Sequence, residues 1–435
     1  MNKMNTGIPN LSRRSFLRTT AATVSGVGAG VLFPNLLARS VLGAAPNPVR
    51  AGIRVGCIAV GNQGGALLKR NLQNVVAVCE VDQARLAAAK AAVEKATQRS
   101  CATYTDYRKL LENKEIDAVM IASPDHWHAL QTIHACQAGK DVYVEKPLSL
   151  MIEEGKLMLK AARHYNRVVQ TGSMQRSDAK FRLACELVRS GRIGRVKTIR
   201  VGLPGVNFNE KTVPDSEPPA GLDYDRWLGP APYRPYNKNR VHYNFRFFWD
   251  YSGGQMTNWG AHHLDIAQWG LGMDASGPVE IESMAMYDRE KRYEVPSRFE
   301  ILYKYASGVT IICGQGQKIG TTFEGDEGSI YVDRGKLSSD PAEIVKEPLG
   351  EKDVHLYVSK NHDDNWYQCI KDRKLPICDV AVGHRSATVC HLGNISVRTG
   401  QLVKWDPLRE EVVDNVELRK WMSYAYREPW RLPVI

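Results

Sequence analysis

Lys146 combines a residue type and a position that could do chemistry. It stands at the end of the apolar run Val142-Tyr143-Val144, after Glu145 and before Pro147. An ammonium group beside a hydroxyl oxygen stabilises a developing alkoxide, and a neutral amine accepts the hydroxyl proton. Either role would help a hydride leave a carbinol carbon. Without the surrounding pattern, the default interpretation is an exposed lysine at the end of a strand.

A second group of chemically capable residues follows Gly253-Gly254. Asn258 and His262 are four residues apart, so a helix through them places both side chains on one face, with Asp265 one turn further. His262 can exchange a proton near neutral pH, whereas the amide of Asn258 can orient a neighbour but cannot become anionic. His262 and His263 diverge by about 100° on a helix and cannot readily share one ion, so we expect no metal site.

A glycine-containing segment that precedes both groups has the form of a dinucleotide fingerprint. The apolar run 53–60 leads directly into Gly61-Asn62-Gln63-Gly64-Gly65 and then into a helical pattern. Gly61 would let the backbone approach a pyrophosphate, and Gly64 would let helix and strand pack closely, with Ala59 in place of the first glycine of the pattern. A glycine turn in an unrelated α/β unit is the alternative interpretation.

Glu80 strengthens the dinucleotide interpretation. It ends the apolar run 75–79, nineteen residues after Gly61, where an acidic residue would bind the hydroxyls of the adenosine ribose. Its carboxylate would repel a 2′-phosphate, which favours NAD over NADP, although the nearby Arg85 leaves NADP open.

Strand and helix patterns alternate through this half of the chain, which predicts a doubly wound parallel sheet. The buried run 118–122 ends in Ser123-Pro124-Asp125-His126-Trp127-His128, at the carboxyl edge where such sheets bind ligands. Asp125 could cap the helix that begins there, or this segment could contact the cofactor, and the pattern supports both interpretations.

These motifs, in this order and spacing, resemble the glucose-fructose oxidoreductase and inositol dehydrogenase family. The resemblance is carried by A-V-G-N-Q-G at 59–64, C-E-V-D at 79–82, S-P-D-H-W-H at 123–128 and E-K-P at 145–147, and it extends to about the C-terminus. It implies a Rossmann domain at 50–172, then an α/β domain at 173–405 with a large, mostly antiparallel open sheet. Residues 406–435 are expected to pack over the body as a tail.

The resemblance also implies a chemistry and a set of site residues. The chemistry is hydride transfer between a nicotinamide and a sugar, glycoside or cyclitol, with Lys146 at the reacting oxygen and a frequent cis bond before Pro147. The family has an aspartate where this chain has Asn258, so we assign proton transfer to His262 with Lys146 as its electrostatic partner. The predicted cofactor-binding residues are Ala59, Gly61, Asn62, Gln63, Gly64, Glu80, Ser123, Pro124, Asp125, Trp127, His128, Glu145, Lys146 and Arg176.

The segment 243–263 holds the candidate substrate-binding residues. Its aromatic side chains could form a carbohydrate platform, with polar contacts from Arg246, or they could be core packing. We predict substrate contacts from Arg246, Trp249 and His263. Arg176 carries a comparable ambiguity, since a solvated arginine at a helix start explains it equally well.

The composition and the first 45 residues bear on partners and location. The net charge is +11, but five of the basic residues lie in the acid-free segment 1–45. The rest of the chain has 53 basic and 47 acidic residues, a net charge of +6, and no dense basic run. Nucleic-acid binding is therefore not expected. Arg13-Arg14 before a weakly apolar Gly/Ala-rich run predicts a twin-arginine export signal and a periplasmic protein. A membrane anchor is the alternative, but Pro34 and three glycines interrupt the run.

The sequence therefore predicts an exported NAD-dependent oxidoreductase that acts on a carbohydrate, and the family resemblance implies a homodimer or homotetramer. Two other functions stay open. One is a glycosidase that uses tightly held NAD for transient oxidation and elimination, and the other is a sugar-binding or sensory protein without turnover.

Overall fold

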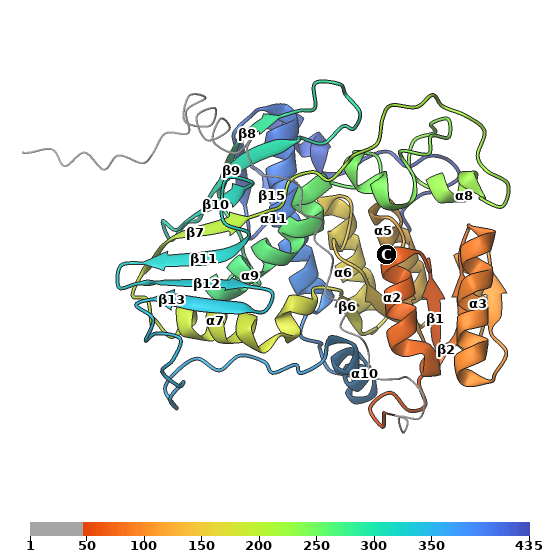
Figure 1. The fold of residues 1–435 in the computed structure, drawn as a ribbon, viewed down its shortest axis with the longest axis horizontal. Helices are drawn as coiled ribbons and strands as arrows, with labels where there is room; N and C mark the ends of the chain where they lie inside the picture. The colour runs from red at the N-terminus through yellow and green to blue at the C-terminus, as the bar shows by residue number, and fades with distance from the viewer. Residues whose placement is uncertain (1–46) are drawn as a thin grey trace, which may run out of the picture. The chain divides into compact units, whose positions relative to one another are not determined.

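The computed structural model describes residues 47–435, and these residues form two sheets with their covering helices (Figure 1). The predicted export signal lies outside the described residues. Within the described range, no helix combines the length and the apolar character needed to cross a membrane.

The first sheet has six strands in the order β3-β2-β1-β4-β5-β6, and every neighbouring pair is parallel. β1, β4 and β5 are buried along their whole length, as expected for strands with helices on both faces. The predicted doubly wound sheet is thus confirmed, with the short β3 as an addition that its polar, half-exposed sequence did not signal. The strands are β1 (Val55–Ile58), β2 (Val75–Cys79), β3 (Ala102–Tyr104), β4 (Ala118–Ile121), β5 (Asp141–Val144) and β6 (Val169–Thr171).

The strand order reverses at β1, between β2 on one side and β4 on the other. Open α/β sheets bind ligands at such a switch point, outside the carboxyl ends of the strands. The segments that leave these carboxyl ends are therefore the ones that matter for function. The helices of this half are α2 (Asn62–Asn71), α3 (Gln83–Thr97), α4 (Tyr107–Glu112), α5 (Asp125–Gln137) and α6 (Ile152–His164), with a 3₁₀ turn η1 (Leu72–Asn74).

The second sheet has nine strands in the order β13-β12-β11-β7-β10-β9-β8-β14-β15. Only β7 and β10 run parallel, so the predicted large, mostly antiparallel sheet is confirmed. The strands are β7 (Val196–Gly202), β8 (Glu280–Met286), β9 (Arg298–Lys304), β10 (Thr310–Gly314), β11 (Gly320–Gly325), β12 (Ser329–Asp333), β13 (Lys336–Asp340), β14 (Val403–Asp406) and β15 (Glu411–Val412).

Three helices, α7, α9 and α11, cover one face of the second sheet (Figure 1). Their apolar side chains and those of the strands form the largest hydrophobic core, which includes Phe181, Leu264 and Phe323. The helical segments of this half are η2 (Met174–Ser177), α7 (Ala179–Arg189), α8 (Tyr224–Leu228), η3 (His242–Phe247), η4 (Met256–Gly260), α9 (Ala261–Leu271), α10 (His362–Asp372), α11 (Val380–Thr399), α12 (Val416–Arg419) and η5 (Lys420–Met422).

The two halves meet along β6 and α6. The N–H of Thr171 donates to the carbonyl of Cys378 at 2.9 Å, and Arg163 pairs with Asp379 just before α11. α11 then packs against α6. The second domain is thereby fixed beside the carboxyl ends of β5 and β6.

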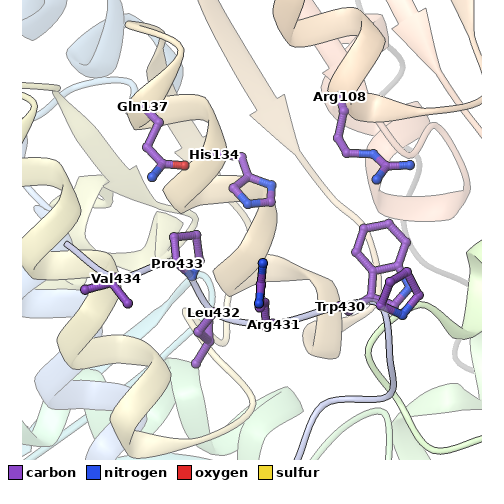
Figure 2. A pocket seen from close by; sticks show the side chains of 9 residues that line it. Arg108, His134, Gln137, Trp430, Arg431, Leu432, Pro433 and Val434 are labelled. Carbon is purple, nitrogen blue, oxygen red and sulfur yellow. The ribbon is translucent and has the colours of Figure 1, made fainter.

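The C-terminal residues pack over the first domain. The Tyr426 hydroxyl donates to the buried Glu154 carboxyl at 2.5 Å, and Arg427 donates to the carbonyl of Gly229 at 2.9 Å. A depression between α5 and this segment is lined by Arg108, His134, Gln137 and residues 429–434 (Figure 2). It shares no residue with the predicted site around Lys146.

Candidate active site

The structure brings Lys146 and Asn258 together from the two domains. Lys146 leaves the carboxyl end of β5, and its Nζ donates to the backbone oxygen of Asn258 at 2.9 Å and to its Oδ1 at 3.1 Å. The peptide bond between Lys146 and Pro147 is cis, as the family resemblance implies. Asn258 lies in the π-helical turn η4, and its amide nitrogen donates to Gln255 at 3.1 Å, which fixes the oxygen toward the lysine.

The environment of Lys146 favours the neutral amine more than water does. Burial lowers the pKa of Lys146 to about 8; Glu145 opposes this shift and the positive charge of Arg246 adds to it. Within the described chain no carboxylate lies within ion-pair distance of Nζ. A group with a pKa near the working pH can both accept and return a proton, which is the property that acid–base catalysis requires.

His262 lies in the first turn of α9, directly after the turn that holds Asn258. Its ring is buried and Nδ1 has no hydrogen-bond partner in the structure. Burial lowers its pKa well below the usual value, and the charges of Lys146 and Arg334 lower it further. A buried ring nitrogen without a partner is uncommon in folded proteins, so this neutral imidazole has hydrogen-bonding capacity to offer a ligand.

Asn258→Asp tests the coupling between this side chain and the lysine. A carboxylate about 3 Å from Nζ stabilises the ammonium, so the pKa of Lys146 should rise by about 1–3 units. Alcohol oxidation needs the neutral amine, so its rate should increase with pH through about 8 in the native protein and through a higher pH in the variant. The pH profile of kcat/KM checks this shift. An unchanged profile would show that Lys146 is not the titrating group.

The glycine segment has the geometry of a phosphate-binding loop. Gly61 is the N-cap of α2, whose first turn carries no acidic residue and no capping side chain, so its N–H groups face outward. Ala59 adopts φ +62°, a conformation more usual for glycine, and a Cβ on Gly64 would clash with the Ala59 carbonyl oxygen. The positive φ at position 59 explains why the fingerprint normally has a glycine there, and the close contact at position 64 requires glycine. The loop therefore fits a dinucleotide.

Glu80 and Arg85 lie beside this loop. The buried Glu80 carboxylate accepts hydrogen bonds from the N–H groups of Val60 and Val81 at 3.0 and 2.8 Å, so it shapes the loop as well as facing its edge. Arg85 lies across Gly61, because a Cβ on that glycine would clash with the guanidinium. Gln63 donates to Glu145 at 2.8 Å and so links the loop to the residue before Lys146, whereas Asn62 is exposed.

The segment 123–128 lies at the carboxyl edge of the first sheet, as predicted, but its side chains bond to other parts of the protein. Asp125 does not cap α5; its buried carboxylate accepts from Ser252 at 2.5 Å, which corrects the capping alternative. His128 bridges the carbonyls of Ser123 and Pro147 at 2.9 and 2.7 Å and so ties this loop to the lysine loop. Pro124 is the N-cap of α5.

Trp127 and its neighbour His126 face away from the glycine loop. The Trp127 indole donates to the carbonyl of Trp227 at 3.1 Å and packs edge-on against Trp430, and the His126 ring is buried against the same carbonyl. The structure thus places Trp127 in a packing role, which corrects its prediction as a cofactor contact. Ser123 donates to Gln131 at 2.7 Å.

Arg176 also departs from the prediction. Its guanidinium is 1% exposed and forms ion pairs with Asp265 and Asp274 at 2.8 and 2.7 Å. Both carboxylates come from α9 and the loop after it, so the arginine holds η2 against α9 and has no side-chain donor directed at a cofactor. The sequence could not show this, because the partners are about ninety residues away.

Two of the three predicted substrate residues are likewise structural. His263 is fully buried, stacks on Trp259 at 6.0 Å between ring centroids, and lies 4.0 Å from Asp333 under the second sheet. Trp249 donates from its indole to the carbonyl of Glu294 at 3.1 Å. Core packing accounts for His263, and Trp249 is half-buried against the aromatic cluster that includes Phe247 and Tyr251. Arg246 differs, because its guanidinium stacks on the Tyr243 ring at 3.8 Å and its charge acts on Lys146.

Arg334 is a site residue that the sequence did not suggest. It occupies the turn between β12 and β13, and its guanidinium lies 4.6 Å from the Trp259 ring, next to Asn258 in the chain. No local pattern distinguishes this arginine from any other in a hairpin turn, since its position depends on how the second sheet packs on α9.

Within residues 47–435, no cluster of three or more His, Cys, Asp or Glu side chains could hold a metal ion. All nine cysteines are buried and free.

Two family models match most of the chain. The one described as "Oxidoreductase family, NAD-binding Rossmann fold" matches residues 51–173. The one described as "Oxidoreductase family, C-terminal alpha/beta domain" matches residues 188–432.

The similar curated proteins each match less than half of this chain. An uncharacterized oxidoreductase of Rhizobium meliloti is 32% identical over 186 residues, which cover 42% of this chain and 54% of that protein. A glycosyl hydrolase family 109 protein of Shewanella baltica is 34% identical over 166 residues, which cover 33% of this chain and 35% of that protein. The chain thus spans about half or less of the length of these relatives.

Among solved structures, the WlbA dehydrogenase from Bordetella pertussis, in complex with NADH and UDP-GlcNAcA, has the same fold. It superposes with a TM-score of 0.61 at 18% identity, over 81% of this chain and 99% of that one.

Proposed function

Since this chain belongs to the oxidoreductase family of glucose-fructose oxidoreductase and inositol dehydrogenase, with its NAD-binding Rossmann domain and C-terminal α/β domain, we propose that it transfers a hydride between NAD and a hydroxyl or keto carbon of a sugar, glycoside or cyclitol. One observation carries the proposal. Lys146 lies at the carboxyl edge of the dinucleotide-binding sheet, with a pKa near 8, and the second domain holds its ammonium through Asn258.

The residues divide into those that hold the cofactor and those that handle the proton. The N-terminus of α2 and the loop at Gly61 would hold the pyrophosphate, and Glu80 would face the adenosine ribose. When bound, the nicotinamide supplies the acceptor or donor of the hydride. In the oxidation direction, the C–H bond of the carbinol breaks as its O–H proton passes to the neutral amine of Lys146, which then releases it to solvent.

His262 and Asn258 support this proton transfer. Asn258 fixes the direction of Nζ through two hydrogen bonds, and the neutral His262 can accept a hydrogen bond at Nδ1 from a second substrate hydroxyl or share the reacting proton. We therefore assign proton transfer to Lys146 and His262 together, with Asn258 as the group that orients the amine.

A second candidate is glycoside cleavage through transient oxidation and elimination. It is favoured by the glycosyl hydrolase family 109 proteins among the relatives of this chain. The same lysine would serve both reactions, because both start by oxidising a ring hydroxyl.

The test begins with native mass spectrometry of the purified protein, which should show a mass increment equal to NAD or NADH. The protein is then incubated with a panel of free sugars, cyclitols and aryl glycosides. Accumulation of NADH with a free sugar supports the dehydrogenase, and release of the aryl group without net NADH supports the glycosidase. A protein that binds no dinucleotide and turns over none of these compounds would contradict the proposal.

We further propose that residues 1–45 direct export by the twin-arginine route, which Arg13-Arg14 supports. We also propose that the protein is a homo-oligomer, which the family resemblance supports. Fractionation of cells that express the Arg13→Lys/Arg14→Lys variant tests the first point, and light scattering of the purified protein tests the second. Periplasmic variant protein or a monomeric scattering mass would contradict them.

A further inference from the structure

We infer that the substrate carries a negatively charged substituent, a carboxylate or a phosphate ester, and that Arg246 and Arg334 recognise it. The inference rests on the proposed function, because it takes the site around Lys146 to be the substrate site.

The two arginines reach this site from different parts of the second domain. Arg334 lies in the β12–β13 turn, 4.6 Å from the Trp259 ring, whose centroid is 6.3 Å from that of His262. Arg246 comes from η3 and lies 3.8 Å over the Tyr243 ring. The charges of both arginines also act on Lys146 and add to the effect of burial on its pKa.

These cations are not balanced by ion pairs in the described chain. Among residues 47–435, Lys146, Arg246 and Arg334 form no ion pair. The charges of Asp125 and Glu145 act on Lys146, but neither carboxylate forms an ion pair with any of the three cations in the described chain: Asp125 accepts from Ser252 and Glu145 accepts from Gln63. Asp333 lies 4.0 Å from His263. Three cations that repel one another around one partly buried position favour an anion there.

The geometry of the two guanidinium groups suits this role. A guanidinium that lies over an aromatic ring keeps N–H groups available to a ligand, and a pair of these N–H groups matches the two oxygens of a carboxylate or phosphate. The stacking also fixes the group, which reduces the entropy lost when a ligand binds. Tyr243 and Trp259 thus present two oriented anion-binding edges.

The experiment compares a neutral sugar with charged analogues. The NADH-loaded protein is titrated by calorimetry with glucose, glucuronate and glucose 6-phosphate at low ionic strength. We expect at least one of the anionic sugars to bind at least tenfold more tightly than glucose. Arg246→Met and Arg334→Met should each remove most of this preference, and 0.5 M NaCl should weaken it.

Arg195→Met is the matched control. Arg195 is an exposed arginine that precedes β7, at the end of the sheet opposite the β12–β13 turn, and its replacement should leave the preference unchanged. The NADH affinity of each variant, measured by fluorescence, distinguishes the substrate from the cofactor as the source of the anion. If the substitutions weaken NADH binding and spare the preference, the arginines serve the cofactor phosphates and the inference is wrong.

The outcomes also separate this inference from the proposed function. Equal binding of all three sugars, a preference that survives both substitutions, or no measurable binding of either anion overturns the inference. Oxidation of a neutral sugar under those results leaves the proposed hydride transfer standing. Preferential binding of an anionic sugar that is never oxidised or cleaved supports the inference and contradicts the proposed activity.

Discussion

Lys146→Met is expected to lower the rate of hydride transfer by about 10³–10⁴-fold, because it removes both the proton acceptor and the positive charge at the reacting oxygen. Methionine preserves the length and apolar stem of the lysine. The site should therefore keep its shape, since among residues 47–435 the hydrogen bonds of Nζ are the two to Asn258. Single-turnover formation of NADH in the protein saturated with NAD and substrate measures the effect on chemistry.

Binding measurements separate this loss from a general failure of the site. The affinity of Lys146→Met for NADH should stay within about threefold of the native value, because the glycine loop and Glu80 belong to other segments. Lys140→Met is the control, since Lys140 precedes the same strand but its Nζ donates to the carbonyls of Asn113 and Ile116. It should lose stability and keep its turnover rate. A Lys146→Met protein with native turnover would rule out the proposed mechanism.

Arg176→Met is expected to lower the free energy of unfolding by about 3–5 kcal/mol, because it leaves a buried carboxylate without its counter-ion. Asp265 is fully buried and keeps only the hydroxyl of Ser386 as a charge-stabilising donor once the arginine is gone. Burial already raises the pKa of Asp265, so its charge depends on Arg176. Urea unfolding followed by circular dichroism measures the change.

Two further variants identify the cause. Adding Asp265→Asn to Arg176→Met removes the stranded charge and should recover a substantial part of the lost stability. Lys109→Met removes a lysine of α4 whose pair with Glu112, at 3.0 Å, connects two exposed side chains of one helix, and it should cost less than about 0.5 kcal/mol. If Arg176→Met is as stable as the native protein, or if its only defect is weaker NADH binding, the original interpretation of Arg176 as a cofactor residue would be restored.

The fold was largely predictable, because its signals are local. Fully buried strands produce continuous apolar runs, and a helix that follows a strand through Gly61 and Gly64 produces a recognisable spacing. β3 escaped prediction because it has only three residues and is half-exposed. The mostly antiparallel character of the second sheet was expected from the family resemblance, whereas its strand order depends on pairing between distant segments.

The site was predictable only in part. The structure brings Lys146 against Asn258, with His262 one helical turn further along, as the sequence suggested. It assigns Trp127, Arg176, Trp249 and His263 to packing or ion pairing, and it adds Arg334. The misassigned residues share one property: each is a polar or aromatic side chain close in sequence to a site residue, but directed toward a partner from a distant segment.

The sequence by itself determined the dinucleotide-binding sheet, the position of the lysine at the end of β5 and the substitution of an amide at position 258, because these depend on residue type and short spacing. Only the tertiary structure decided which polar groups face the lysine and which form hydrogen bonds or ion pairs with other parts of the protein. The physical reason is that a buried charge must find a partner, and the partner's location is set by packing. Asp265 satisfies Arg176 across η2 and α9, whereas Arg246 and Arg334 rest on aromatic rings beside the lysine without an ion pair in the described chain.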